Sequence, residues 1–423
     1  MKIEQLYDKY KQFPNVQTDT RKLVAGEMYF ALKGGNFNGN LFAKQALEQG
    51  AAYAIVDEKE FANDEKTILV DDVLTTLQQL AHYHRMQFNI PFIAITGSNG
   101  KTTTKELIHT VLNSKFKTYT TEGNLNNHIG IPLTILKIKQ DAQIAVIEMG
   151  ANHLHEIEAY CTIAAPTHGL ITNCGKAHLE GFGSLDGVKK AKGELFDFLR
   201  TQNDATVFIM NDFDYLCTMS FGIKNIKTYG TKNAETVGTA SLNNDLLTVN
   251  LNNGTIINTQ LIGDYNLPNV LAAVSLGTYF NIDMGTIKKS IENYAPSNSR
   301  SQLIIKDSNH IILDAYNANP SSMQLAIENF TKIEAENKIL ILGAMAEMGQ
   351  ESVAEHQQLI QHIKKYSWLD VILVGKEFLP FQQEFKVFKH SAEAAEWYKN
   401  NQPSHAYILV KGSRSSKMEL VIA

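Results

Sequence analysis

The chain has 423 residues, of which 44% are hydrophobic and 20% charged, and it carries a net charge of −5. This length exceeds a single hydrophobic core, so we expect two or three globular domains, and the acidic balance argues against a nucleic-acid partner. The polar start MKIEQLYDKY, the lack of a long apolar run and three scattered cysteines predict a cytoplasmic protein without signal peptide, membrane insertion, disulfides or a cysteine metal site.

The first region is predicted to be a small α/β domain at residues 1–89. Short strands such as MYFAL and YAIVD alternate there with a helical segment.

A glycine-rich loop, GSNGKTT, then connects the buried strand IPFIAI to a helix. Gly97 and Gly100 allow backbone N–H groups to turn toward an anion, and the helix N-terminus adds a favourable dipole. Lys101 would reach the outer phosphates of a nucleotide, and the hydroxyl of Thr102 would bind Mg²⁺. The strict phosphate-loop pattern requires glycine at Ile95, so this loop is a variant. We predict a nucleotide site rather than an ordinary glycine turn, formed by Gly97, Ser98, Asn99, Gly100, Lys101, Thr102 and Thr103.

Polar residues follow the next strands. The strand AQIAVI ends at Glu148, and the strand GLIT leads toward His178. Because parallel strands end at the same edge of a sheet, we expect Glu148 to bind Mg²⁺ directly or through a neighbour, and His178 to bind a second metal. An exposed loop glutamate and an ordinary loop histidine are the alternatives. The loop with Asn126 and Asn127 is interpreted either as a site for a polar ligand or as a surface turn.

The helix LDGVKKAKGELFDFL places a lysine on its apolar stripe. Lys192 lies four residues after Val188 and three before Leu195. A lysine that faces inward must extend its head group to water, pair with a charge, or be chemically changed. Reaction with CO₂ would give a carbamate, an anion able to bind cations. The spacing alone leaves extension and carbamylation equally open.

The rest of the chain is predicted to contain added hairpins and a third domain. Residues 226–262 are strand-like and rich in Asn, Gly and Thr, which predicts antiparallel hairpins beside a parallel sheet. A helix with VLAAVSLGTYF and a linker at Tyr294–Ser297 follow, so the central domain is placed at residues 90–295. Residues 296–423 repeat a βα rhythm, with strands in HIILDAY, KILILGA, DVILVG and AYILVKG, and predict a parallel sheet covered on both faces.

The third domain also carries candidate ligand contacts. Asp314 ends the strand HIILDAY, and Asn319 before Pro320 fits either a ligand contact or a plain helix start. Arg300 and the run Lys411–Arg414 supply cations that could face phosphates or a carboxylate. Solvated surface charge is the alternative interpretation.

With these residues laid out, the chain resembles the Mur ligase family over essentially its whole length. The resemblance rests on the ordered motifs TGSNGKTTTK, GNLNNHIGIP, EMGANH, TNCGKAHLEGFGS with AKGELF, DAYNANPSSM and KGSR. It implies an α/β fold of three domains: a small α/β UDP-binding domain, a central phosphate-loop-type ATPase with a parallel sheet and added antiparallel strands, and a Rossmann-like C-terminal domain.

The resemblance also implies an activity. EMGANH, AHLEGFGS and YNANP are similar to the branch that joins D-alanyl-D-alanine to UDP-N-acetylmuramoyl-tripeptide. This implies an ATP-dependent and ADP-forming ligase of peptidoglycan precursor synthesis that works through an acyl phosphate. The chain is expected to be a monomer, although its sequence does not give the oligomeric state. The implied cofactors are ATP, two Mg²⁺ ions and a CO₂-derived carbamate on Lys192. The rivals are a Mur-type ligase for another amine or for folate, and a catalytically inactive nucleotide-binding regulator.

The matching motifs imply roles for individual residues. Catalysis and metal binding are assigned to Lys101, Thr102, Glu148, His178 and carbamylated Lys192. Further ATP contacts are assigned to Asn266 and Asn269 near the adenine and to Arg300 and Asp314 near the ribose or phosphate. UDP-substrate binding is assigned to Thr20, Arg21, Lys33, Gly34, Asn38, Gly39, Asn126 and Asn127. The dipeptide side is assigned to Tyr316, Asn317, Asn319, Lys411, Ser413 and Arg414.

Three positions depart from the family pattern. Ala344 and Asn38 stand where Asp is usual, and Tyr265 stands where His is frequent. None of the three is expected to be needed for phosphoryl transfer.

Overall fold

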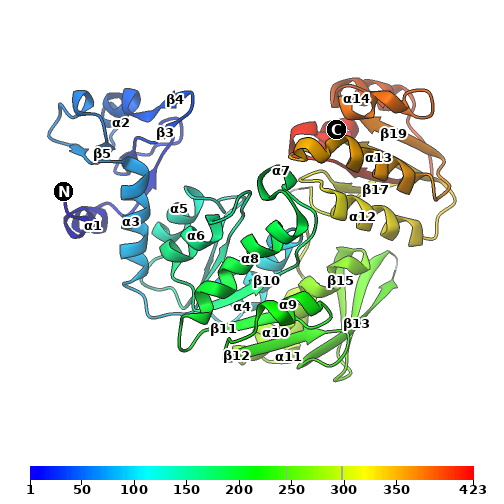
Figure 1. Cartoon of the computed structure of the whole chain (residues 1–423), viewed down its shortest axis with the longest axis horizontal. Helices are drawn as coiled ribbons and strands as arrows, with labels where there is room; N and C mark the ends of the chain where they lie inside the picture. The colour runs from blue at the N-terminus through cyan, green and yellow to red at the C-terminus, as the bar shows by residue number, and fades with distance from the viewer. Residues whose placement is uncertain (244, 297–298) are drawn as a thin grey trace.

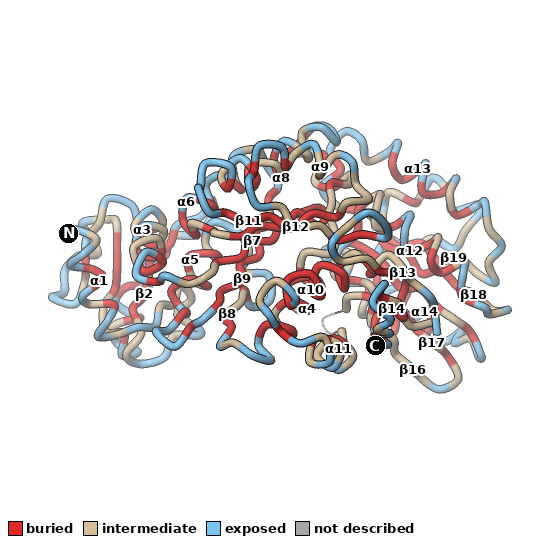
Figure 2. Tube along the Cα trace, turned by 90° about the horizontal axis from the view of Figure 1, so that it is seen from below, coloured by how far each residue is buried: buried red, intermediate tan, exposed pale blue. Residues whose placement is uncertain are grey.

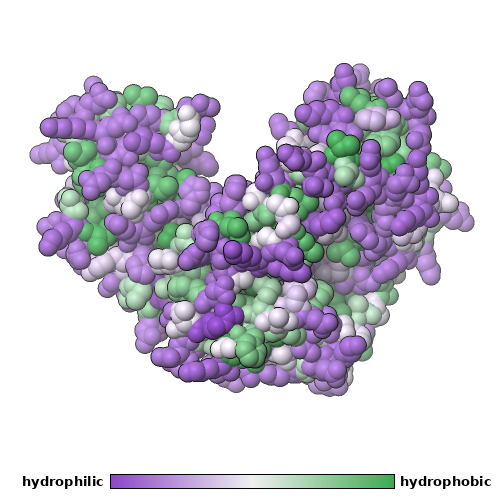
Figure 3. All heavy atoms as spheres, viewed as in Figure 1, coloured by the Kyte–Doolittle hydropathy of each residue, from purple (hydrophilic) through white to green (hydrophobic). Residues whose placement is uncertain are grey.

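The computed structural model describes residues 1–243, 245–296 and 299–423. Within these ranges the strands form sheets of four, nine and six strands and one two-stranded ribbon. Figure 1 shows the three larger sheets following one another as N-terminal, central and C-terminal lobes. A broad hollow separates the N-terminal lobe from the C-terminal lobe in the space-filling view (Figure 3). The predicted α/β class with three sheet-centred parts is confirmed.

The N-terminal lobe is built on a parallel sheet in the order β1-β2-β5-β6. Its strands are β1 (Val16–Gln17), β2 (Met28–Phe30), β5 (Tyr53–Val56) and β6 (Thr67–Leu69), and the ribbon is β3 (Lys33–Gly34) with β4 (Phe37–Asn38). Its helices are α1 (Ile3–Gln12), α2 (Ala43–Glu48) and α3 (Val73–Arg85). The segments MYFAL and YAIVD are strands, as predicted.

The central lobe is a nine-stranded sheet in the order β15-β14-β13-β12-β11-β10-β7-β9-β8 within the described residues. Its strands are β7 (Phe92–Thr96), β8 (Thr118–Thr120), β9 (Ile144–Glu148), β10 (His168–Ile171), β11 (Thr206–Met210), β12 (Asn225–Gly230), β13 (Thr236–Asn243), β14 (Leu246–Leu251) and β15 (Ile256–Ile262). Strands β13, β14 and β15 pair antiparallel, which confirms the added hairpins. The prediction began them too early, because β12 pairs parallel with both β11 and β13.

Helices cover both faces of the central sheet. They are α4 (Lys101–Asn113), α5 (Gly130–Leu136), α6 (Glu156–Ala164), α7 (Leu179–Phe182), α8 (Leu185–Arg200), α9 (Asp214–Met219), α10 (Leu267–Tyr279) and α11 (Met284–Glu292). Figure 2 shows the buried strands between α8 on one side and α4 with α10 on the other. Strands covered on both faces are apolar throughout, which explains why runs such as FIAI were recognisable as strands.

The C-terminal lobe is a six-stranded sheet in the order β16-β17-β21-β18-β19-β20 within the described residues. Its strands are β16 (Gln302–Lys306), β17 (Asn309–Asp314), β18 (Lys338–Gly343), β19 (Asp370–Val374), β20 (Lys386–Phe388) and β21 (Tyr407–Lys411), and its helices are α12 (Pro320–Lys332), α13 (Ser352–Ile363) and α14 (Ser391–Asn400). All pairs are parallel except β16 with β17. Of the predicted linker Tyr294–Ser297, Ser297 lies outside the described residues.

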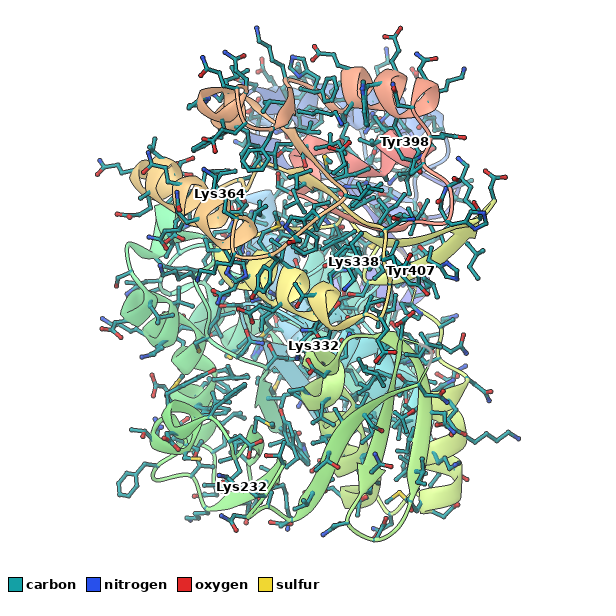
Figure 4. The ribbon with its side chains drawn as sticks, turned by 90° about the vertical axis from the view of Figure 1, so that its right-hand side faces the viewer. Lys232, Lys332, Lys338, Lys364, Tyr398 and Tyr407 are labelled. Atoms are coloured by element: carbon teal, nitrogen blue, oxygen red, sulfur yellow. The ribbon has the colours of Figure 1, made fainter. Side chains whose placement is uncertain are left out.

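Polar contacts join the C-terminal lobe to the central lobe. Lys332, at the end of α12, pairs with Asp264 at 2.6 Å, and Figure 4 shows this lysine where α12 meets the central lobe. Asn329, one helical turn earlier, accepts a hydrogen bond from the backbone N–H of Asp264 at 3.0 Å. In the part of the chain that the structure describes, no helix is long and apolar enough to cross a bilayer.

A buried arginine joins the N-terminal lobe to the central lobe. Arg85 ends α3 and is 6% exposed. Its guanidinium donates hydrogen bonds of 2.9 Å to the backbone carbonyls of Phe88, Ala164 and Ala165, and it lies 3.8 Å from the centre of the Phe92 ring. Hydrogen bonds from a charged donor are stronger than neutral ones, so this contact fixes α3 against the end of α6.

We expect Arg85→Ala to lower the apparent melting temperature by about 5–10 °C, because it leaves three carbonyls and a ring without their partner. Scanning calorimetry measures the shift. Arg200→Ala is the matched control, since Arg200 also donates to two backbone carbonyls but lies at the surface. Equal shifts for the two variants would contradict the role given to burial.

Candidate functional site

A cavity of about 500 Å³ lies at the carboxyl ends of the central strands, which is the usual place for ligands in open α/β sheets. Its wall combines the phosphate loop, the loops after β9 and β10, the start of α10 and part of the C-terminal lobe. The residues that bear on its chemistry are Ser98, Asn99, Gly100, Lys101, Thr102, Thr103, Asn126, Asn127, Glu148, His178, Asn266, Asn269, Arg300, Asp314, Tyr316, Asn317, Glu347 and Lys411.

The phosphate loop has the predicted strand–loop–helix form, between the end of β7 and the start of α4. Gly97 and Gly100 both have positive φ, 141° and 79°. A Cβ on Gly97 would lie 2.0 Å from the Thr172 hydroxyl, and one on Gly100 would lie 2.7 Å from Oδ1 of Asn269. Both the conformation and the close approach therefore require glycine at these two positions.

Lys101 begins α4 and is directed back over the loop. Its Nζ donates to the carbonyls of Gly97 at 2.7 Å and Ser98 at 3.3 Å. Burial lowers the pKa of Lys101, while the nearby charge of Glu148 raises it and that of Arg300 lowers it. The loop thus holds a cation at a helix N-terminus, a combination that suits a phosphate.

Glu148 is the central carboxylate of the cavity and is 1% exposed. Its oxygens accept hydrogen bonds from the Thr102 hydroxyl at 2.9 and 3.1 Å, and Oε1 accepts one from the Asn126 amide at 2.8 Å. A carboxylate beside a hydroxyl is a donor set that fits Mg²⁺, which is usually held by one or two carboxylates together with substrate phosphates. Among the described residues there is no group of three His, Cys, Asp or Glu that would form an all-protein metal site.

His178 lines the same cavity but meets a residue that the sequence did not suggest. Its Nδ1 lies against the Glu347 carboxylate, which comes from the C-terminal lobe. The His178 contact lowers the pKa of Glu347. Glu347 follows the end of β18 by four residues, so the rule that placed Glu148 at a strand end could have found it.

Lys192 is buried rather than extended to solvent, with 1% exposure. Its Nζ donates to the carbonyl of Ala151 at 3.1 Å and lies 5.0 Å from the centre of the Phe182 ring. Ala151 lines the cavity, so Lys192 lies directly behind the cavity wall. Burial, and next the charge of Lys101, lower the pKa of Lys192 to about 7. A large fraction of this amine is therefore neutral near pH 7.

The residues expected near the adenine form a buried amide pair. Asn269 donates to Oδ1 of Asn266 at 2.8 Å, and its own Oδ1 accepts from the Thr104 hydroxyl at 2.9 Å. Both asparagines line the cavity. The adjacent Tyr265 shares a hydrogen bond of 2.8 Å with the hydroxyl of Ser301.

The C-terminal lobe contributes cations and an acid to the cavity. Arg300 lies 3.5 Å from the centre of the Tyr316 ring. Lys411 is 3% exposed; it pairs with Asp314 at 2.5 Å and donates to the carbonyl of Asn317 at 3.2 Å. The structure therefore brings five of the residues expected from this lobe to the cavity.

Three other residues assigned to the dipeptide side are absent from the described cavity wall. Ser413 donates to the carbonyl of Ala344 at 2.6 Å, and Arg414 pairs with Glu419 at 3.1 Å. Asn319 contacts the phosphate loop instead, donating to Oδ1 of Asn99 at 2.8 Å. In this structure their side chains serve contacts within the protein.

A second pocket, of about 520 Å³, lies in the N-terminal lobe. Its lining is Thr18, Asp19, Thr20, Arg21, Tyr29, Phe37 and Phe42. Phe37 and Phe42 stack with ring centres 5.5 Å apart, and Arg21 forms a two-pronged ion pair with Asp19. The structure therefore brings together an aromatic pair and a solvent-exposed charged pair on this wall.

The other residues expected around UDP lie beside this pocket or in the central cavity. Lys33 pairs with Asp57 at 3.0 Å, and the Asn38 amide donates to Glu58 at 3.1 Å. Gly34 stands next to Lys33 in the ribbon, and Gly39 approaches Leu32 so closely that a Cβ would lie 2.5 Å from its carbonyl. Asn126 and Asn127 line the central cavity instead, so the expected set is divided between two sites.

Comparison with known proteins places these features in a family. The chain matches the models of the Mur ligase family, catalytic domain (residues 12–85), the Mur ligase middle domain (95–277) and the Mur ligase, glutamate ligase domain (299–414). The UDP-N-acetylmuramoyl-tripeptide–D-alanyl-D-alanine ligases of Bacillus subtilis and Escherichia coli are 33% and 34% identical to it, each over 96% of this chain and 92% of the relative. Crystal structure I of MurF from Acinetobacter baumannii superposes with a TM-score of 0.89 at 28% identity, covering 99% of this chain and 97% of that one.

The lowered pKa of Lys192 predicts a pH-dependent stability. Below pH 7 the Lys192 amine is charged in both the folded and the unfolded chain, so burying that charge lowers the free energy of unfolding by on the order of 3–5 kcal/mol. Between pH 7 and 10.5 the unfolded chain binds more protons than the folded one, so the free energy of unfolding rises with pH. In CO₂-free buffer, calorimetry should therefore show Lys192→Met melting above the natural chain at pH 6, by a margin that shrinks toward pH 10. Lys190→Met, an exposed change on the same helix, should show no such trend. A constant margin would contradict the lowered pKa.

Proposed function

The chain belongs to the Mur ligase family, and we propose that it joins D-alanyl-D-alanine to UDP-N-acetylmuramoyl-tripeptide, with ATP as energy source, in cytoplasmic peptidoglycan precursor synthesis. Relatives that match over 92% of their own length bear this activity in their names. The observation that carries the proposal is one cavity in which Lys101 and Thr102 of the phosphate loop meet Glu148 and, from the other lobe, Arg300. Such a cavity can hold a nucleotide and a second anion together. We propose that the enzyme acts as a monomer.

The chemistry explains why ATP is needed. A peptide carboxylate resists attack by an amine, because the group that must leave would be oxide. In the proposed reaction a carboxylate oxygen attacks the γ-phosphorus, the bond to the bridging oxygen breaks, and ADP leaves. The amine of D-alanyl-D-alanine then attacks the acyl phosphate carbonyl, a C–N bond forms, and inorganic phosphate leaves as the amine loses its proton.

The protein's main task is to bring two anions together. Lys101 would neutralise the outer phosphates, and Arg300 would add charge from the C-terminal lobe. Asn266 and Asn269 would contact the adenine side, and Asp314 the ribose or phosphate. Contact of both lobes with one cavity would also exclude water that would hydrolyse the acyl phosphate.

Thr102 and Glu148 would hold one Mg²⁺ ion, and His178 and Lys192 would serve a second. When bound, the ions would neutralise charge on the phosphate oxygens. Glu148 is prepared for this role, because its carboxylate is buried and oriented by Thr102 and Asn126. His178 has Nδ1 occupied by Glu347, which directs the remaining ring nitrogen, Nε2, to any ligand.

We propose that Lys192 carries a carbamate. Only a neutral amine attacks CO₂, and the pKa of about 7 makes much of Lys192 neutral under cellular conditions. The change would replace a buried cation with an anion next to Lys101. Burial is the main cause of the lowered pKa of Lys192, and the change would turn the second cause, repulsion by Lys101, into attraction.

The two pockets would hold different ends of the UDP-linked substrate. Thr20 and Arg21, with the stacked Phe37 and Phe42, would bind the uridine diphosphate end, and the neighbouring Lys33, Gly34, Asn38 and Gly39 would support it. Asn126 and Asn127 would contact the peptide end in the central cavity. Tyr316, Asn317 and Lys411 would face the incoming dipeptide.

Mass spectrometry tests the activity directly. We expect the UDP-pentapeptide, ADP and phosphate from ATP, D-alanyl-D-alanine and a UDP-tripeptide, with either lysine or a diamino diacid as third residue. Lys101→Ala should reduce the rate by about 100- to 1,000-fold or more, because it removes charge from the transferring phosphoryl group. Product only with another amine would assign the chain to a different Mur-type reaction, and no phosphate release at all would favour an inactive regulator.

Lys192→Ala tests the carbamate. We expect a loss of activity on the order of 100-fold, with part of it restored by millimolar acetate or propionate, which can place a carboxylate where the carbamate would be. Lys190→Ala should keep its activity, and the added acids should not change its rate. If no acid restores Lys192→Ala while the natural enzyme is active, the carbamate is unsupported.

A further inference from the structure

The start of helix α12, in the C-terminal lobe, is hydrogen-bonded to the phosphate loop of the central lobe. Asn319, which precedes the first residue of α12, donates from Nδ2 to Oδ1 of Asn99 at 2.8 Å. Asn319 is 4% exposed, and Asn99 lines the central cavity.

The orientation of Asn319 is fixed by its own helix. Its Oδ1 accepts a hydrogen bond from the N–H of Ser322 at 2.9 Å and so caps α12, while its N–H donates to the Ser322 hydroxyl at 3.1 Å. Because Oδ1 serves the cap, Nδ2 is the end left for Asn99. Asn99 in turn accepts through Oδ1, so its amide donor is the end left for an anionic ligand.

Asn99 is also fixed from its own lobe. Its carbonyl accepts from the Thr172 hydroxyl at 2.6 Å and from the Asn173 amide at 3.1 Å, and its N–H donates to Oδ1 of Asn173 at 3.1 Å. The backbone of Asn99 thus belongs to the central lobe. The side chain is oriented by the C-terminal lobe.

A second contact supports the first. The Ser321 hydroxyl accepts from the N–H of Lys176 at 3.0 Å, and Gly175 allows this approach, since a Cβ there would lie 2.9 Å from the hydroxyl. Gly175 exchanges hydrogen bonds of 2.9 and 3.0 Å with the hydroxyl of Ser98, in the phosphate loop. Lys176 also pairs at 2.7 Å with the buried Glu355 of α13.

We propose that Asn319 is a positioning residue for the phosphate loop: through Asn99 it sets the loop's amide donor for the nucleotide phosphates when the C-terminal lobe is docked. This assigns Asn319 to the nucleotide side of the reaction and not to the dipeptide side. The proposal rests on the proposed function only in that the loop binds a nucleotide. It adds a path by which docking of the C-terminal lobe changes nucleotide affinity.

A double-mutant cycle on the full-length protein tests the coupling. The changes are Asn319→Ser, which keeps an oxygen for the helix cap, Asn99→Ala, and the two together. Calorimetric titration with ADP and Mg²⁺ should show each single change weakening affinity about three- to tenfold, the effect of one hydrogen bond. The double variant should bind ADP no more weakly than the single variant with the lower affinity, since the two changes remove the same contact.

Asn329→Ser is the matched control, because Asn329 lies in the same helix and also hydrogen-bonds to the central lobe, at Asp264. It should change ADP affinity less than twofold. Asn319→Ser should also raise the KM for ATP and leave the KM for D-alanyl-D-alanine unchanged, with a melting temperature near that of the natural chain.

Additive losses in the cycle would overturn the proposal. A raised KM for the dipeptide with unchanged ADP affinity would overturn it too, in favour of a dipeptide contact. The ligation assay distinguishes failure of the Asn319 proposal from failure of the proposed function. If the natural chain binds ADP but makes no product, the ligase proposal is wrong, and the double-mutant cycle can still be interpreted. A natural chain that binds no nucleotide would contradict both the ligase proposal and the role of Asn319.

Discussion

The buried carboxylate of Glu148 is the constraint around which the central cavity is arranged. A charge with 1% exposure is costly unless hydrogen bonds and a nearby opposite charge compensate it, and Glu148 has both. Thr102 and Asn126 supply the hydrogen bonds, and Lys101 supplies the opposite charge. These partners come from a helix start and a separate loop, so stabilising one anion fixes the relative position of three chain segments. A pocket held this way is ordered before any ligand arrives, which is what phosphoryl transfer requires.

Much of this arrangement was predictable because its causes are local. The loop between β7 and α4 needs glycine for positive φ at two positions, and parallel strands covered on both faces are continuous apolar runs. Glu148 followed from the rule that parallel strands end at one edge. The error at β12 has a physical reason as well: its residues run from exposed at the start to buried at the end without alternating, so its pattern does not tell parallel from antiparallel partners.

Contacts between lobes were not predictable, since no local pattern encodes them. Asn319 and Asn99 are 220 residues apart in sequence, and Glu347 reaches His178 only because β18 and β10 end on facing lobes. Ser413 was expected in the cavity for its motif, but its hydroxyl donates to the carbonyl of Ala344, directly after β18. The sequence therefore indicated which residues to expect in the cavity, while the structure shows which of them line it and what their side chains contact.

The two junctions between lobes differ in kind. At one of them Arg85 is sealed from solvent and bound to three carbonyls. The other relies partly on water-exposed ion pairs, such as that of Lys332 with Asp264, whose attraction dissolved ions screen. A rise in ionic strength should thus loosen the C-terminal lobe before the N-terminal one. The salt concentration around the protein would then set how often the two lobes that line the central cavity meet, while the N-terminal lobe keeps its place.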